Sequence, residues 1–174
     1  SNAAHSLPAK FEQESFAFNS GVLRGIPKQE ERWKRAVHLV DASMGESLGK
    51  LYVEKYFPAE HKAKMEKLVA NLLLAYKNSI AGLDWMSPAT KAEAQAKLAS
   101  FMPKIGYPNK WRDYSALEIK AGDVLGNARR ANAFAAQFEI DKLGKPIDRA
   151  AWGMTPHTVN AYYNPELNEI VFPA

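Results

Sequence analysis

The sequence predicts a mainly α-helical protein with four to five helices followed by a C-terminal β-hairpin. Apolar residues recur at spacings of three and four along most of the chain, which is the period of a helix with one buried face. Residues 155–174 change to strand-forming side chains on both sides of a turn. The length of 174 residues, with 47% hydrophobic and 24% charged residues, fits one globular domain.

Helix-stop signals separate the predicted helices. A short helix is expected around Phe11 to Val22, followed by a loop. Later helices are expected over residues 30–56, from residue 58 or 59 to about 81, over residues 88–100, and from residue 122 or 123 until Gly144 and Pro146. Phe57 precedes a proline, and such a residue disfavours the helical conformation. Ser87 is a typical N-cap residue, with proline at the first helical position.

The helix over residues 30–56 carries one apolar stripe, which assigns Trp33 to the core. Gly45 and Gly49 weaken the stripe, and they indicate close helix packing or a kink. Residues 104–113, which follow a later helix, are expected to form a loop or a short extended piece.

The hairpin is predicted from two groups of strand formers: Thr158, Val159, Tyr162 and Tyr163, then Ile170, Val171 and Phe172. Asn164, Pro165 and Asn168 supply the turn between them. A lone hairpin is only marginally stable in water. It should therefore rest on the helices, on a missing partner sheet, or on another molecule. Its exposed edge predicts a homo-oligomer or strand exchange.

Charge and composition exclude several classes of protein. The net charge is +4, and the densest basic clusters are Arg32, Lys34 and Arg35, and Arg129 and Arg130. No aromatic-interleaved basic stripe accompanies these clusters, so no nucleic-acid partner is expected. The chain has no cysteine, which rules out disulfides and cysteine-ligated metal. No apolar run is long enough to span a bilayer. Residues 1–3 are typical of a remnant of tag removal.

The C-terminal stretch resembles a known family. The run Val159-Asn160-Ala161-Tyr162-Tyr163, followed by Asn168-Glu169-Ile170-Val171-Phe172-Pro173-Ala174, is similar to the segment ahead of the zinc motif in neprilysin-family metallopeptidases. That family includes neprilysin, endothelin-converting enzyme and the bacterial endopeptidase O group. Further matches lie upstream, in the family's order: residues 48–53, 83–86, 90–91 and 104–108, and Trp152.

The resemblance implies that the chain is an internal fragment of a larger, two-domain helical peptidase, ending before the H-E-x-x-H motif. Residues 4–150 would be its chamber wall and interdomain helices, and residues 151–174 would begin the catalytic domain. The parent would be an extracytoplasmic zinc endopeptidase, periplasmic, secreted or membrane-anchored. It would cleave oligopeptides on the amino side of apolar residues.

No zinc site is expected within these residues. A zinc peptidase of this class needs two histidines one helical turn apart, with a glutamate between them as the base. The four histidines are His5, His38, His61 and His157, and none has a partner four residues away. We therefore expect no catalytic residue, no metal ligand and no peptidase activity in this chain, with zinc as a cofactor of the full-length parent only.

The resemblance assigns substrate binding to Asn160, Ala161 and Tyr162. The asparagine and the alanine would hold the main chain of a peptide substrate on an edge strand, and Tyr162 would border a neighbouring subsite. From the residues alone, Asn160 pairing locally within the hairpin is the simpler interpretation. A second hypothesis is a non-catalytic helical protein-interaction module. An H-E-x-x-H motif in the next stretch of the reading frame would favour the enzyme.

Overall fold

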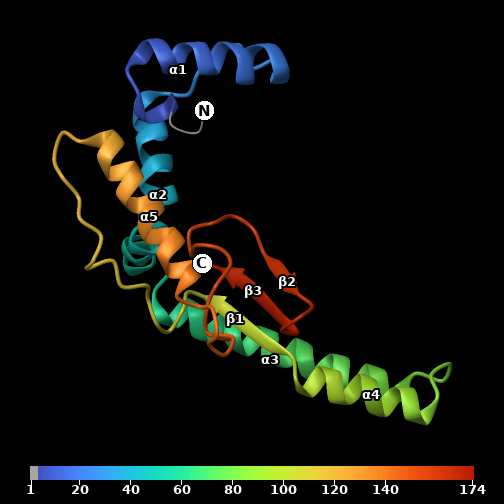
Figure 1. Ribbon diagram of the computed structural model, residues 1–174. Coiled ribbons are helices and arrows are strands. Elements are labelled where there is room, and N and C mark those ends of the chain that lie inside the picture. Colours follow the sequence, from blue (N-terminus) through green and yellow to red (C-terminus); the bar gives the residue numbers. More distant parts are fainter. Residues whose placement is uncertain (1–3) are drawn as a thin grey trace. The chain divides into compact units, whose positions relative to one another are not determined.

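The computed structural model describes residues 4–174, apart from the side chain of His5, and the proposed tag remnant, residues 1–3, lies outside the described residues. The chain divides into two compact units. The first comprises the residues up to Gly45 together with Asp113–Ile147, and the second comprises Glu46–Arg112 and Asp148–Ala174. The chain is mainly helical with a small sheet near its C-terminus, as the sequence predicts (Figure 1).

The first unit is helical. Its elements are the short helix η1 (Ala4–Ser6), α1 (Ala9–Phe16), the π-helical turn η2 (Ala17–Val22), the first part of α2 and α5 (Val124–Ile140). The Asp123 side chain accepts a hydrogen bond from Gly126 N at 2.9 Å and so caps α5. Ala131 of α5 is buried, and the ring of Tyr114 stacks on Phe134 with centroids 5.6 Å apart. Leu117 is buried as well, so the core of the first unit combines small, aliphatic and aromatic side chains.

The helix α2 (Arg32–Tyr56) is interrupted where the sequence shows its weak point. Met44 has non-helical dihedral angles of φ −150° and ψ 46°, immediately before Gly45. The expected kink is thus confirmed. Trp33, in contrast, is 62% exposed rather than part of a core, and its indole Nε1 donates to Glu31 Oε2 at 2.7 Å. Helical spacing identified the apolar stripe, but spacing alone does not show which of its residues other elements cover.

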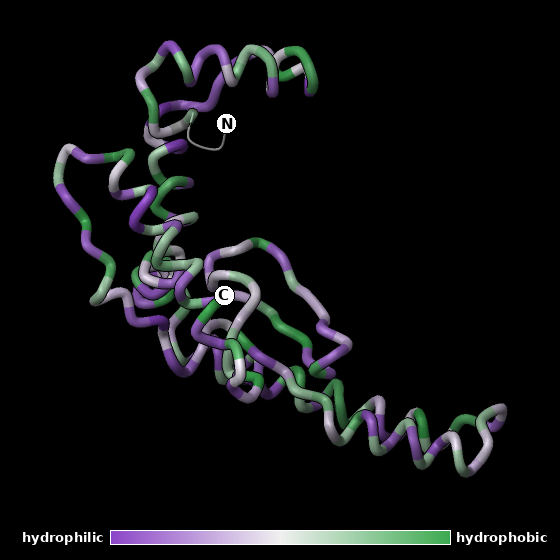
Figure 2. The backbone as a smooth tube through the Cα atoms, viewed as in Figure 1, coloured by the Kyte–Doolittle hydropathy of each residue, from purple (hydrophilic) through white to green (hydrophobic). Residues whose placement is uncertain are grey.

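In the second unit, α3 (Ala59–Gly82) and α4 (Pro88–Ala99) form a helical hairpin. The Ser87 side chain accepts from Thr90 N at 3.2 Å, which confirms the predicted N-cap. Hydrophilic and hydrophobic residues are interspersed along both helices in Figure 2, as expected for helices with one packed face.

A three-stranded sheet completes the second unit, with β1 (Met102–Gly106), β2 (Tyr162–Asn164) and β3 (Glu169–Pro173) in the order β1-β3-β2. The strand β3 runs antiparallel to β2 and parallel to β1, and α3 contacts β1. The predicted hairpin is therefore present, but its partner strand lies within the same chain. The sequence predicts a loop or a short extended piece over residues 104–113, and the first three of these residues belong to β1.

No helix among residues 4–174 is both long and apolar enough to cross a membrane.

Candidate functional site

The strand β2 has one paired edge and one unpaired edge among the described residues. It pairs only with β3, with Tyr162 opposite Val171 and Asn164 opposite Glu169. Asn160 and Ala161 come immediately before this strand, and both are exposed. The observed strand is shorter than predicted, because it begins at Tyr162 rather than near Thr158.

The backbone ahead of β2 is folded on itself by local hydrogen bonds. Asn160 Oδ1 accepts from the N–H of Ala161 at 2.8 Å, and Asn160 N donates to the carbonyl of Thr158 at 2.9 Å. The Asn160 side-chain NH₂ group keeps two donors for another molecule, since an amide side chain offers both donors and acceptors. Asn160 is thus locally paired through its oxygen and accessible through its nitrogen.

Tyr162 faces the chain that leads into β2. Its half-buried hydroxyl accepts a hydrogen bond from Gly153 N at 2.7 Å. Burial raises the pKa of the Tyr162 hydroxyl above its ordinary value, the hydrogen bond from Gly153 opposes this, and the nearby carboxylate of Glu169 raises it further. The hydroxyl therefore stays protonated at neutral pH.

A buried ion pair lies on the same side of the sheet. Lys104 of β1 and Glu169 of β3 are 8% and 2% exposed, and Lys104 Nζ lies 2.7 Å from Glu169 Oε2. Lys104 Nζ also donates to the carbonyl oxygen of Ala151 at 2.7 Å. Oε2 accepts no hydrogen bond from the described residues, so its contact with Nζ is a charge attraction, which does not depend on the angle. Lys104 is opposite Val171 and Val171 is opposite Tyr162, so all these side chains share one face.

Pro156 lies in the middle of the segment that leads from Gly153 to Tyr162, and it is held in place there. It is fully buried, its carbonyl accepts from Ala174 N at 2.8 Å, and it lies against Gly49 of α2. A Cβ atom at Gly49 would lie 2.7 Å from Pro156 Cδ, closer than real Cβ contacts. Gly49 is thus a close-packing site, but its partner is the turn residue Pro156 rather than the helix that the sequence predicts.

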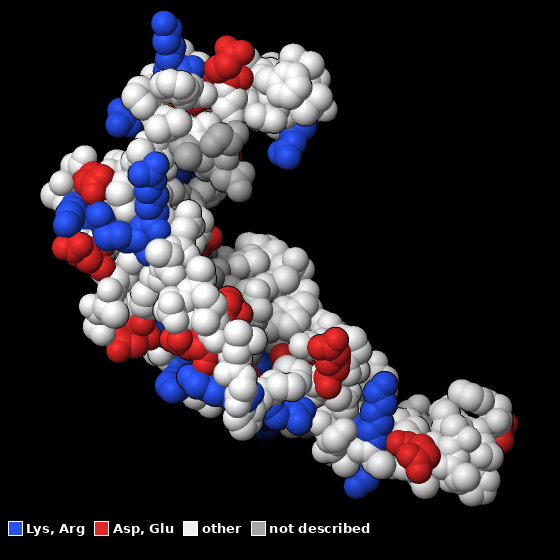
Figure 3. All heavy atoms as spheres, viewed as in Figure 1, with Lys and Arg blue, Asp and Glu red and all other residues white. Residues whose placement is uncertain are grey.

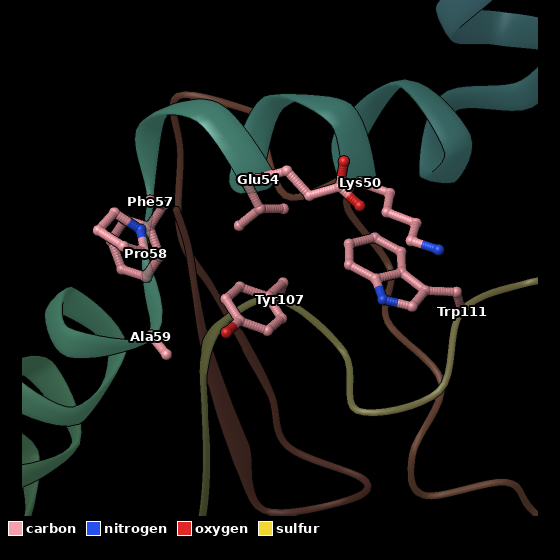
Figure 4. A pocket seen from close by; sticks show the side chains of 8 residues that line it. Lys50, Glu54, Phe57, Pro58, Ala59, Tyr107 and Trp111 are labelled. Carbon is pink, nitrogen blue, oxygen red and sulfur yellow. The ribbon is translucent and has the colours of Figure 1, made fainter.

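A shallow pocket of about 300 Å³ lies at the junction of α2 and α3 (Figure 4). Its wall includes Phe57, Tyr107 and Trp111, with the charged side chains of Lys50 and Glu54 on the helix above. The rings of Tyr107 and Trp111 are stacked with centroids 6.1 Å apart. The pocket contains no histidine and one carboxylate, so it offers no metal-binding set.

No group of three or more histidine, cysteine or carboxylate side chains within the described part of the chain could hold a metal ion. The ring of His61 lies 6.0 Å from that of Phe57, and the ring of His157 lies 6.2 Å from that of Tyr52. Acidic and basic side chains are interspersed on the face that Figure 3 shows.

Comparison with known proteins shows the class to which this helical chain belongs. Residues 1–108 match the family model described as peptidase family M13. The chain therefore belongs to peptidase family M13, and the resemblance to neprilysin-family enzymes is confirmed.

Related proteins agree with this assignment. The chain is 33% identical to a neutral endopeptidase of Lactobacillus helveticus, covering 99% of this chain and 27% of that one. The open-state structure of the Mycobacterium tuberculosis zinc metalloprotease ZMP1 is 49% identical, with a TM-score of 0.90, covering 99% of this chain and 27% of that chain. PepO from Lactobacillus rhamnosis is 31% identical, with a TM-score of 0.88, covering 99% of this chain and 28% of that chain. The chain thus spans about a quarter of the length of these relatives.

Sequence reasoning missed the Lys104–Glu169 pair and the contact between Tyr162 and Gly153. One signal was present: each charged residue stands beside strand-forming or apolar neighbours, Lys104 before Ile105 and Glu169 before Ile170. Opposite charges inside two strands are typical of a cross-strand pair. Using that signal requires knowing that β1 is a strand.

Proposed function

We propose that the whole protein containing this chain is a zinc-dependent endopeptidase that cleaves oligopeptides on the amino side of apolar residues. Membership of peptidase family M13 supports this proposal, as do relatives named neutral endopeptidase and zinc metalloprotease. In this proposal the zinc ion is held by residues beyond these 174. Bound there, zinc would supply Lewis-acid chemistry that polarises the scissile carbonyl and activates a water molecule.

The contribution of this chain is a substrate-binding edge. The free edge of β2, with exposed Asn160 and Ala161 beside it, is the observation that supports this role. An extended peptide can add to such an edge through main-chain hydrogen bonds. The Asn160 amide donates to a substrate carbonyl, the small Ala161 lets the substrate backbone approach, and Tyr162 borders the neighbouring subsite.

The rest of the chain has a supporting role in the same proposal. The helical region, residues 4–150, forms chamber wall and interdomain helices, and residues 151–174 begin the catalytic domain. The protein acts outside the cytoplasm, which rests on the family resemblance alone.

Two substitutions at Asn160 in the full-length, zinc-loaded protein test this role. Asn160→Ala should raise the KM for an oligopeptide substrate about fivefold, the usual effect of one lost hydrogen bond, with kcat little changed. Asn160→Asp keeps the oxygen that accepts from Ala161 but removes the amide donor. It should therefore behave like Asn160→Ala.

The same pair of variants separates substrate binding from local folding. If Asn160→Asp has the KM of the wild type, the side chain serves only its own backbone and the proposed edge is wrong. Asn71→Ala, at an exposed position of α3, is the control and should leave both constants unchanged.

A helical protein-interaction module is the alternative. The exposed apolar side chains of α3, such as Leu68, Leu72 and Tyr76, favour it. Stoichiometric zinc and peptide cleavage by the full-length protein would exclude a purely non-catalytic module.

A further inference from the structure

The segment that leads into β2 is a loop held at two points, and a third point lies just ahead of it. Residues 153–162, which we call the presenting loop, contain Asn160 and Ala161 close to its end. The Gly153 N–H donates to the Tyr162 hydroxyl at 2.7 Å, so one hydrogen bond joins the two ends of the loop. In the middle, Pro156 is buried against Gly49 and accepts from Ala174 N.

The third point lies just ahead of the loop, at Ala151. Its carbonyl accepts from Lys104 Nζ at 2.7 Å. A lysine ammonium has three donors, and here it also lies 2.7 Å from Glu169 Oε2. Glu169 thus balances the charge of a lysine that holds the chain entering the loop. Figure 1 shows β1 and β3, which carry these two residues, side by side.

Stability by itself does not explain the buried pair of Lys104 and Glu169. A buried pair can often be replaced by apolar residues of similar volume without loss, because desolvation of two charges offsets their attraction. An apolar pair of similar volume would leave the Ala151 carbonyl without the donor that Lys104 Nζ now supplies. The specific effect of Lys104 is therefore to fix the position of the chain that enters the presenting loop.

We propose that Lys104 and Tyr162 are positioning residues that clasp the presenting loop to the sheet and so fix the main chain of Asn160 and Ala161 for a peptide. This inference rests on the proposed function, since it concerns the same edge. Neither side chain need touch the substrate for this role. Each acts through backbone atoms, Lys104 through Ala151 and Tyr162 through Gly153.

Tyr162→Phe is the most conservative test, because it removes one oxygen atom and keeps the ring. Gly153 is exposed, so water can satisfy its freed N–H and the fold should persist. In the full-length, zinc-loaded protein we expect a KM about fivefold higher for a fluorogenic oligopeptide, with kcat nearly unchanged. Amide hydrogen exchange of residues 153–161 should become faster, which reports the loosened loop without any substrate.

Tyr163→Phe is the matched control. Tyr163 is the next residue on β2, and its hydroxyl donates to Asn168 Oδ1 at 3.1 Å, away from the presenting loop. Tyr163→Phe should leave KM and the exchange of residues 153–161 unchanged.

The double variant Lys104→Met with Glu169→Leu tests the bond from Lys104 to the carbonyl of Ala151. It removes both charges together, and it should raise KM and speed up exchange as Tyr162→Phe does.

The outcomes separate this inference from the proposed function. If Asn160→Ala raises KM but Tyr162→Phe and the double variant match the wild type in KM and exchange, the clasp is wrong and the edge stands. If Asn160→Ala leaves KM unchanged, the edge is wrong, and hydrogen exchange alone decides the clasp. If the amides of residues 153–161 exchange no faster in Tyr162→Phe than in Tyr163→Phe, the clasp is overturned.

Discussion

At the scale of single residues, the most consequential pair is Lys104 and Glu169. Two charges taken out of water lose their hydration, and each depends on the other to offset that loss. With exposures of 8% and 2%, neither side chain can reach solvent if its partner disappears. Replacing either residue alone should therefore lower the free energy of unfolding far more than replacing both together.

We predict that Lys104→Met lowers the free energy of unfolding by about 3–5 kcal/mol, because Glu169 would be left buried and unpaired. Adding Glu169→Leu should restore most of that loss. Equilibrium urea unfolding of the two variants and the wild type measures both values. Lys64→Met is the control: it removes an exposed pair with Glu60 on α3 and should change stability by less than about 1 kcal/mol. A loss at Lys104 no greater than at Lys64 would contradict this account.

At the scale of elements, the contact between α2 and the presenting loop depends on a missing side chain. Gly49→Ala should destabilise the chain, since its Cβ would lie 2.7 Å from Pro156 Cδ and 3.3 Å from His157 Nδ1. Overpacking of this kind costs about 1–3 kcal/mol, which exceeds the helix propensity of up to about 1 kcal/mol that alanine adds. Thermal unfolding should therefore show a lower Tm.

Gly82→Ala is the matched control at the end of α3. Nothing lies within 4 Å of a Cβ atom there, so alanine should stabilise by about 0.5–1 kcal/mol through helix propensity alone. Equal gains in Tm at positions 49 and 82 would show that Gly49 is not a close-packing site.

The elements that the sequence predicts well are those with local signals. Ser87 caps α4 and Phe57 ends the run of α2 because these signals act within one turn of the backbone. For the region of β1 the sequence predicts only a loop or a short extended piece, since Pro103 suggests a helix stop. Proline is tolerated there because, within residues 4–174, β1 is an edge strand. Its partner β3 is distant in the sequence.

The candidate site was predictable only through the family resemblance. Composition and spacing gave Asn160 no role beyond local pairing, and the observed bond from Ala161 N to Asn160 Oδ1 agrees with that local role. The proposed substrate contact depends on a partner molecule, so no pattern within the chain can encode it. Lys104 and Glu169 come together only through the parallel pairing of β1 with β3, which is again a long-range event.

At the scale of the whole molecule, much apolar surface is exposed. Large apolar side chains with half or more of their area accessible occur in both units: Phe11, Phe18, Val22, Leu23, Trp33, Leu51, Tyr56, Leu68, Leu74, Tyr76, Trp85, Ile119, Val124, Ile140, Leu143, Ile147 and Val159. Exposed apolar surface of this extent marks interaction sites. Since the chain spans about a quarter of its relatives' length, we attribute this surface to contacts within the whole protein.

We therefore predict that the 174-residue chain self-associates when studied alone. Val159 is fully exposed next to the unpaired edge of β2. Charged residues, and lysine especially, block pairing between sheet edges. Val159→Lys should consequently shift sedimentation of the chain toward the monomer. Val22→Lys places the same substitution on an exposed valine of the first unit, distant from the edge in sequence. A wild-type chain that is monomeric at all concentrations, or an equal shift by both variants, would show that the β2 edge does not drive association.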